Sequence, residues 1–303
     1  MAFKIGVLIS DNLTEDHEDT REDVFELEEQ MAKIIPAFKA QGMIVDTVRW
    51  RDAASLADEY DAFLPLFVWD YFENNQDLFL SEMAKVSQKT KLFNEFDVLK
   101  WNSDKSYLED LEKSGAPVIR TLYVNAATES SVHNAMETLN AEKVVIKPVI
   151  GGGAWRQSLY HKDDVFPDRE SLPPQSAMIQ AFLPSVQSEG EYSFIYFGGQ
   201  FSHAVLKRAK SGDYRIQSVF GGTEETYTPS SAERANAREI LDALDFIPLY
   251  ARVDLLRGND GQLKLIELEL LEPYLYLAHA PGDGAENKGA QKLASAVLKR
   301  LGN

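Results

Sequence analysis

Three carboxylates recur inside two apolar stretches near the end of the chain, Asp254 in "ARVDLL" and Glu267 and Glu269 in "LIELEL". The stretches flank residues 259–261, Asn-Asp-Gly, and Asp-Gly between apolar runs is a strong hairpin signal. With a two-residue Asp-Gly loop, Asp254 lies opposite Glu267, and Glu269 points to the same face. Adjacent carboxylates would then lie roughly 5–8 Å apart. They repel one another unless a cation lies among them, and a solvated outer face is the alternative.

A lysine and a glycine run form the second candidate site, in "VVIKPVIGGGAW". Lys147 ends a buried strand, where an ammonium group is costly unless an anion compensates it. Residues 151–153 are glycines, whose backbone amides can approach a phosphate closely and whose loop can close as a lid. A glycine-rich turn with Lys147 reaching water is the alternative. Lys105, near the start of a predicted helix, opposes the helix dipole unless an anion lies close.

A cationic patch stands out in "LKRAKSGDYR", with Lys207, Arg208, Lys210 and Arg215 in a chain of net charge −17. Such a patch favours anion capture, although lysines also protect exposed hairpin edges. Lysines and glycines suit phosphates, and a carboxylate trio suits magnesium, which bridges phosphates. Together these residues indicate nucleotide-dependent phosphoryl transfer.

Composition narrows the classes of function. The 303 residues suit about two or three packed units. The negative net charge argues against a nucleic-acid partner. The sequence contains no cysteine, which excludes disulfides and thiolate chemistry, and its five histidines show no metal-ligand spacing. No apolar run approaches the ~18 residues of a membrane span, and the N-terminus does not read as a signal peptide, so a cytoplasmic protein is expected.

The periodicity of apolar residues predicts α/β structure first and antiparallel sheets afterwards. Strand, helix and strand alternate over the first 70 residues, which implies a parallel sheet. Helices are expected at 24–38 with a kink at Pro36, from about 77, at 103–114 with Asn102 or Ser103 as N-cap, at 231–244 and at 287–301. Strands are expected at the start (4–10), in "MIVDTVRW", "YDAFLPLFVWDYF", "VIRTLYV", "KVVIKPVI", "SAMIQAFL", "EYSFIYFGGQFSHAVLKRA" and "DYRIQSVF", and in the carboxylate hairpin.

From about Trp101 onward the order of these motifs resembles that of the ATP-grasp carboxylate–amine ligases, such as bacterial glutathione synthetase, D-alanine–D-alanine ligase and the ribosomal-protein glutamate ligases. The resemblance implies an α/β N-terminal domain plus α+β ATP-grasp domains, with the nucleotide held between two antiparallel sheets. The implied domains are 1–100, the N-terminal α/β domain; 101–183, the central subdomain with the glycine-rich lid; and 184–303, the C-terminal subdomain with the metal-binding hairpin.

The resemblance also implies roles for individual residues. Phosphate contacts would come from Lys105, Lys147, Gly151, Gly152 and Gly153, and a further nucleotide contact from Lys207. Gln180, Ala181, Phe182 and Leu183 would line the adenine, and Glu189 or Glu191 the ribose. Asp254, Glu267 and Glu269 would hold Mg²⁺ or Mn²⁺, and Arg252 and Arg215 would stabilise the transferring group.

The implied reaction uses ATP to convert a small carboxylate into an acyl-phosphate, which an amine attacks to give an amide, ADP and phosphate. Asp70, Arg156 and Tyr274 are the expected substrate contacts, and Asp70, between aromatic residues, could hold a substrate ammonium. The partners are thus small molecules, and a homodimer is common in the family.

Two departures from the family pattern bear on the substrate. Glu269 stands where the family usually has asparagine, and "ELELLEPYLYL" replaces a loop of small residues. With "FVWDYFENN" in the first domain, they indicate a less characterised branch, near the D-cycloserine-forming ligase. The alternatives are a ligase that modifies a protein or peptide terminus, and an ATP-binding regulatory protein without turnover.

Overall fold

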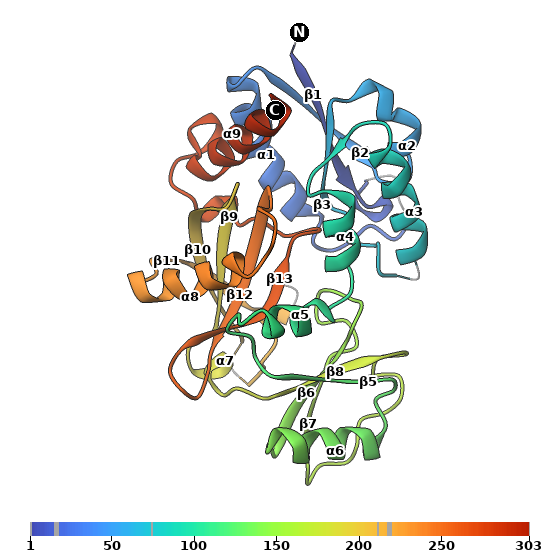
Figure 1. Cartoon of the computed structure of the whole chain (residues 1–303), viewed down its shortest axis with the longest axis vertical. Helices are drawn as coiled ribbons and strands as arrows, with labels where there is room; N and C mark the ends of the chain where they lie inside the picture. The colour runs from blue at the N-terminus through green and yellow to red at the C-terminus, as the bar shows by residue number, and fades with distance from the viewer. Residues whose placement is uncertain (1, 15–17, 74, 211, 217–219, 303) are drawn as a thin grey trace.

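The computed structural model describes residues 2–14, 18–73, 75–210, 212–216 and 220–302. Three sheets organise this part of the chain. In Figure 1 the sheet of the first third lies at the top, the sheet of residues 121–181 at the bottom, and the largest sheet between them on the left.

The first sheet is parallel, as the strand–helix–strand order predicts, with strand order β2-β1-β3-β4. Its strands are β1 (Phe3–Ile9), β2 (Met43–Arg49), β3 (Ala62–Phe67) and β4 (Lys91–Leu92). The helices and 3-10 turns of this region are η1 (Asp11–Leu13), α1 (Val24–Ala40), α2 (Ala53–Leu56), η2 (Ala57–Glu59), α3 (Gln76–Ser87) and α4 (Phe96–Asn102). Helix α1 continues past Pro36, and Gly42, with a φ of 78°, turns the chain into β2.

The second sheet is antiparallel, with strand order β5-β8-β6-β7. Its strands are β5 (Thr121–Val124), β6 (Lys143–Pro148), β7 (Ser158–His161) and β8 (Ala177–Ala181). Helix α5 (Tyr107–Lys113) leads into it, and α6 (Glu129–Leu139) packs against it through Val132 and Met136.

The third sheet is antiparallel and has the strand order β11-β10-β9-β12-β13. Its strands are β9 (Glu191–Phe197), β10 (Gln200–Arg208), β11 (Thr223–Tyr227), β12 (Tyr250–Arg257) and β13 (Leu263–Glu269). The associated helices and turns are α7 (Ser185–Ser188), α8 (Ser231–Asp242), η4 (Leu277–His279), η5 (Gly284–Glu286) and α9 (Lys288–Leu301).

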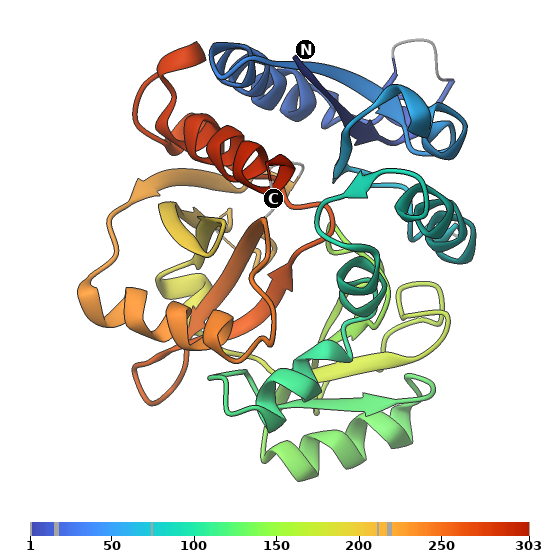
Figure 2. The ribbon, with the colours of Figure 1, turned by 45° about the horizontal axis from the view of Figure 1, so that its top comes forward.

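The last helix, α9, joins the first and third sheets. Figure 2 shows it between α1 and the third sheet, and its residues Leu293 and Val297 share one core with Phe38 of α1 and Ile195 of β9. Burial of this common apolar surface favours a fixed position of the first sheet relative to the third. Within the described residues, no helix has the length and apolar character needed to span a membrane.

Several elements differ from the sequence prediction. Residues 213–216 of the predicted strand "DYRIQSVF" have no regular structure, and 217–219 lie outside the described residues. The edge strand is β11 instead, which the sequence did not indicate because four of its five residues are exposed and it lacks apolar alternation. Asn102 ends α4 rather than capping the next helix, whose N-cap is Ser106. Helix α6 and strand β7 were also not predicted.

Candidate functional site

The hairpin of β12 and β13 pairs Asp254 with Glu267, as predicted, but by a different route. Its connection spans 258–262, closed by a hydrogen bond from the Gly258 amide to the Gln262 carbonyl, so the loop is longer than two residues. A bulge between Asp254 and Leu255 then inserts Ile266 as an extra residue in β13. The longer loop and the bulge compensate for each other, and the predicted pairing results.

The bulge changes which side chains face inward. Ile266 and Glu267 are consecutive, yet both line the same cleft, while Leu265 and Leu268 face the opposite core. Glu269 pairs with Arg252 on β12. The two strands therefore present three carboxylates and one guanidinium to the cleft.

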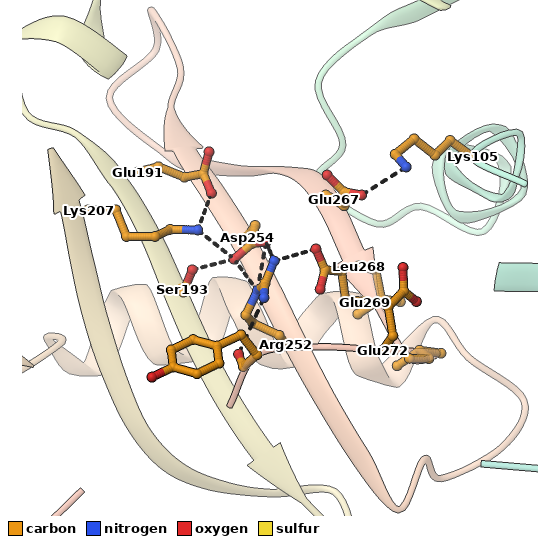
Figure 3. Close-up of polar contacts among 12 residues, drawn as sticks. Lys105, Glu191, Ser193, Lys207, Arg252, Asp254, Glu267, Leu268, Glu269 and Glu272 are labelled. Carbon is orange, nitrogen blue, oxygen red and sulfur yellow. Dashed lines mark hydrogen bonds and ion pairs between the residues drawn. The ribbon is translucent and has the colours of Figure 1, made fainter. Parts of the chain in front are cut away.

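Basic side chains engage these carboxylates (Figure 3). The Arg252 guanidinium donates to Asp254 at 3.0 Å from Nε to Oδ2, and also to the carboxylate of Glu269. Lys207 Nζ lies 3.4 Å from Asp254 Oδ1 and 2.5 Å from Glu191 Oε1. The hydroxyl of Ser193 donates to Asp254 as well. Asp254, only 2 % exposed, is thus fully engaged by neighbouring donors.

The carboxylates of the site have unequal charge environments. Burial disfavours the ionised form of Asp254, but Arg252 and Lys207 outweigh it and lower its pKa. Burial raises the pKa of Glu269 well above its usual value; Arg252 opposes this shift, and the nearby carboxylates of Glu267 and Asp254 reinforce it. The neighbouring cations thus stabilise the charge of Asp254, whereas burial disfavours the charge of Glu269.

Lys105 and Lys147 lie on the opposite wall. Lys105 Nζ is 3.0 Å from Glu267 Oε1 and also donates to the Gly151 carbonyl, so it connects the acid row to the glycine loop. Burial opposes its charge, yet Glu267 raises its pKa. Burial lowers the pKa of Lys147, whose ammonium has no ion-pair or hydrogen-bond partner among the described residues. An anion entering the cleft would find Lys147 available.

The glycine loop follows β6 and folds back toward the first sheet. Gly151 and Gly153 have φ values of 154° and 58°, and Ala154 and Arg156 also have positive φ, at 59° and 49°. A side chain at Gly151 would be strained in this conformation. The Trp155 ring lies 6.0 Å from the Phe72 ring, between centroids, so the loop contacts the first domain across the cleft.

The charged groups and the glycine loop described above line one cleft of about 990 Å³ between the second and third sheets and the first domain. Most of the predicted site residues face it: Lys105, Lys147, Gly151, Gly152, Gly153, Arg156, Gln180, Ala181, Phe182, Leu183, Glu191, Lys207, Arg215, Arg252, Asp254, Glu267, Glu269 and Tyr274. The fold therefore gathers segments separated by up to 170 residues around one space.

Two predicted residues do not face the cleft. Glu189 accepts hydrogen bonds from Arg257 Nε at 2.7 Å and from the Tyr192 hydroxyl at 2.9 Å, so of the two ribose candidates Glu191 alone faces inward. Asp70 accepts a hydrogen bond from Trp50 Nε1 at 2.7 Å, and Trp50 is fully buried. The prediction that Asp70 contacts substrate does not match this position, because its carboxylate is directed into the core.

The sequence prediction did not include seven charged residues of the cleft: Arg21, Asp23, Glu26, Glu29, Glu73, Glu224 and Glu272. Arg21 lies over the Trp69 ring at 5.5 Å and pairs with Asp23 at 2.8 Å. Arg21 and Glu73 lie on loops without periodicity, so no sequence signal marked them. Glu272, in the unusual segment "ELELLEP", could have been found as an acid next to the carboxylate hairpin.

The carboxylate oxygens of the cleft are candidate ligands for a divalent metal ion. No three His, Cys, Asp or Glu side chains of the described residues form a group that could hold a metal. The acid oxygens are nevertheless the ligands that Mg²⁺ prefers, and a cation beside Glu269 would offset the burial and the neighbouring carboxylates that raise its pKa. Asp254, Glu267 and Glu269 therefore fit such an ion chemically, provided that it replaces part of the ion pairs with Arg252 and Lys207.

Comparison with known proteins relates this chain to ligases. Residues 8–94 match the family model described as the N-terminal domain of D-cycloserine synthetase DcsG. The chain is 27 % identical over 295 residues to the cycloserine biosynthesis protein DcsG of Streptomyces lavendulae, covering 89 % of this chain and 93 % of that protein.

Solved structures agree with the sequence comparison. The crystal structure of D-cycloserine synthetase DcsG superposes with a TM-score of 0.81 at 25 % identity, over 98 % of this chain and 99 % of that one. D-alanine–D-alanine ligase from Bacillus anthracis, complexed with ATP, superposes with a TM-score of 0.61 at 16 % identity, over 99 % and 97 %. The second likeness concerns the fold alone, which is the predicted combination of an α/β domain and two antiparallel ATP-grasp sheets.

Proposed function

Because the chain belongs to the ATP-grasp carboxylate–amine ligases, which form ADP, we propose that it activates a small, amino-acid-like carboxylate as an acyl-phosphate for attack by an amine. The observation that carries the proposal is the single cleft in which lysines, a glycine loop, two arginines and three carboxylates meet. No side-chain nucleophile is needed, since positioning and charge neutralisation account for most of the catalysis of phosphoryl transfer.

In this proposal the nucleotide binds between the second and third sheets. Lys105, Lys147 and the backbone amides of 151–153 hold its phosphates, with Lys207 nearby; residues 180–183 surround the adenine, and Glu191 binds the ribose. The free ammonium of Lys147 and its lowered pKa support this role, because an anion would relieve the cost of its burial.

Asp254, Glu267 and Glu269 would hold Mg²⁺ or Mn²⁺. When bound, the metal supplies charge neutralisation to the phosphates. Arg252 and Arg215 stabilise charge on the group in transfer. Arg252 already spans Asp254 and Glu269, so a shift of its guanidinium toward the substrate would release oxygens of both.

The substrate would bind between Arg252 and the first domain, where Arg156 and Tyr274 line the cleft. An amino-acid-like substrate has the support of the similarity to D-cycloserine synthetase over nearly the whole chain. We further propose the domain division 1–100, 101–183 and 184–303, supported by one sheet in each range. The homodimer stays a prediction that sedimentation would test, and the cytoplasm is the proposed location because ATP is the phosphoryl donor.

The test is phosphate release from Mg-ATP with a panel of amino acids and amino-acid-derived carboxylates. Release that depends on one substrate and is lost in Lys147→Ala and Glu267→Gln would support the proposal. Tight ATP binding without release in any mixture would instead favour an ATP-binding regulatory protein. Release only in the presence of a peptide would favour modification of a peptide terminus.

A further inference from the structure

The charged side chains around the metal-binding hairpin are almost all paired. The pairs are Lys105 with Glu267, Lys207 with Glu191 and Asp254, and Arg252 with Asp254 and Glu269. Two charged groups remain without such a partner among the described residues near this hairpin, the ammonium of Lys147 and the carboxylate of Glu272. The proposed function assigns Lys147 to phosphate, whereas Glu272 has no assigned role.

Glu272 is held in a fixed position by its backbone. It follows the fully buried Leu271 and precedes Pro273, and Trp69 Nε1 donates a hydrogen bond to its carbonyl oxygen at 3.1 Å. Its carboxylate lines the cleft, and Figure 3 shows it near Glu269 with no dashed line to any drawn side chain. The backbone of Glu272 is therefore anchored, while its carboxylate is available to a ligand in the cleft.

The surroundings of Glu272 favour a cationic ligand. Glu272 lies where the carboxylate row meets the first domain, whose contribution here is the Trp69 ring. Arg21, which lies over the Trp69 ring, is already paired with Asp23 and lies 3.7 Å from Glu73. Lys105, on the other side, is paired with Glu267. Because these cations are already paired, a positively charged ligand would best compensate the negative charge of the Glu272 carboxylate.

We propose that Glu272 binds the ammonium group of the substrate and thereby selects carboxylates that carry a neighbouring amine, as free amino acids do. This inference rests on the proposed function, because it assumes that the substrate carboxylate lies toward Arg252. An α-amino acid has its two charges one carbon apart, so its ammonium would fall among the side chains next to Arg252 and Glu269. Among these, Glu272 is the acid that has no ion pair or hydrogen bond to another side chain among the described residues.

The test compares Glu272→Gln with the wild-type protein, measuring ADP formation at saturating Mg-ATP while the amino acid is varied. The KM for the amino acid should rise between about tenfold and a hundredfold, because a charge-assisted hydrogen bond is lost. The KM for ATP should change less than about twofold, and Glu272→Asp should recover part of the affinity. A substrate analogue without the amine should bind equally to wild type and variant.

Glu224→Gln is the matched control. Glu224 lines the same cleft, but its carboxylate is already paired, with His279 Nε2 at 3.1 Å, so the amino-acid KM should not change. If Glu272→Gln leaves that KM unchanged, or instead raises the Mg²⁺ concentration needed for activity, the inference is wrong while the ligase function stands. If the wild-type protein forms no ADP with any amino acid, the proposed function fails first and the inference fails with it.

Discussion

Replacing Asn102 by alanine tests whether the strand that carries Glu267 and Glu269 is positioned from outside the hairpin. The Asn102 side chain is buried and bonds to β13 on both sides of Glu269: its Nδ2 donates to the Leu268 carbonyl, and its Oδ1 accepts from the Leu270 amide, each at 2.8 Å. Alanine cannot make either bond. Both backbone groups would lose their partner, and the segment that carries Glu269 would lose its anchor.

The structure gives a magnitude for this loss. A buried backbone group left without a partner costs about 1–3 kcal/mol, so two such groups should lower the free energy of unfolding by about 2–6 kcal/mol. At about 2.1 cal/mol/K of unfolding entropy per residue, the midpoint of thermal unfolding should then fall on the order of 3–10 °C. Because Glu269 lies between the two bonds, the Mg²⁺ concentration for half-maximal ADP formation should also rise.

The assay combines thermal unfolding with a Mg²⁺ titration of activity below the unfolding range. Asn134→Ala, on the exposed side of α6, is the matched control and should change neither quantity. A stability loss with an unchanged Mg²⁺ requirement would contradict the positioning of Glu269 by Asn102. Unchanged stability would contradict the whole argument from the two buried bonds.

Three further predictions concern protonation, the lid and the metal. His203 is buried with a pKa lowered to about 4, chiefly by burial. Its protonation therefore favours the unfolded state. The stabilisation that neutral His203 contributes is fully present above pH ~6.5, and the free energy of unfolding should fall by about 3 kcal/mol between pH 6.5 and 4. Urea unfolding at several pH values should show that the free energy of unfolding depends less steeply on pH in His203→Gln than in the wild-type protein. Phe72→Ala removes the ring that faces Trp155 of the glycine loop. Single-turnover experiments should then show slower substrate-dependent phosphate release with normal ATP binding. An unchanged rate would argue against closure of the glycine loop on Phe72. Chelation by EDTA should abolish ADP formation and added Mg²⁺ should restore it, and persistent activity in EDTA would refute a metal role for Asp254, Glu267 and Glu269.

The carboxylate hairpin shows how far local sequence rules reach. Alternation and an Asp-Gly turn correctly predicted that Asp254 faces Glu267, although the loop length was wrong. The bulge at Ile266 cannot be read from the sequence, because it depends on how Leu265 and Leu268 fill the core below. The apolar pattern determines which residues of the strand face the core, and the backbone bulges locally so that Leu265 and Leu268 both stay buried.

Long-range partners explain most of what the sequence could not predict. Glu189 and Glu191 are two residues apart and seemed equivalent for the ribose, but Arg257, 68 residues after Glu189, draws that carboxylate away from the cleft. Strand β11 escaped detection because it is an exposed edge that pairs with β10 through its backbone. Neither outcome is encoded in a short window of residues.

Asp70 and Glu272 make the same point about function. Each is an acid beside apolar and aromatic residues, and each could hold a substrate ammonium by composition alone. The Trp50 indole, 20 residues before Asp70, occupies one carboxylate and removes it from the cleft. The Trp69 indole, 203 residues before Glu272, bonds only to the backbone of the other and leaves its carboxylate free. An acid whose carboxylate is bonded within the core, as in Asp70, stabilises the fold, whereas an acid bonded only through its backbone, as in Glu272, keeps its carboxylate available to a ligand. Which of these atoms is bonded depends on the folded chain and cannot be predicted from the local sequence.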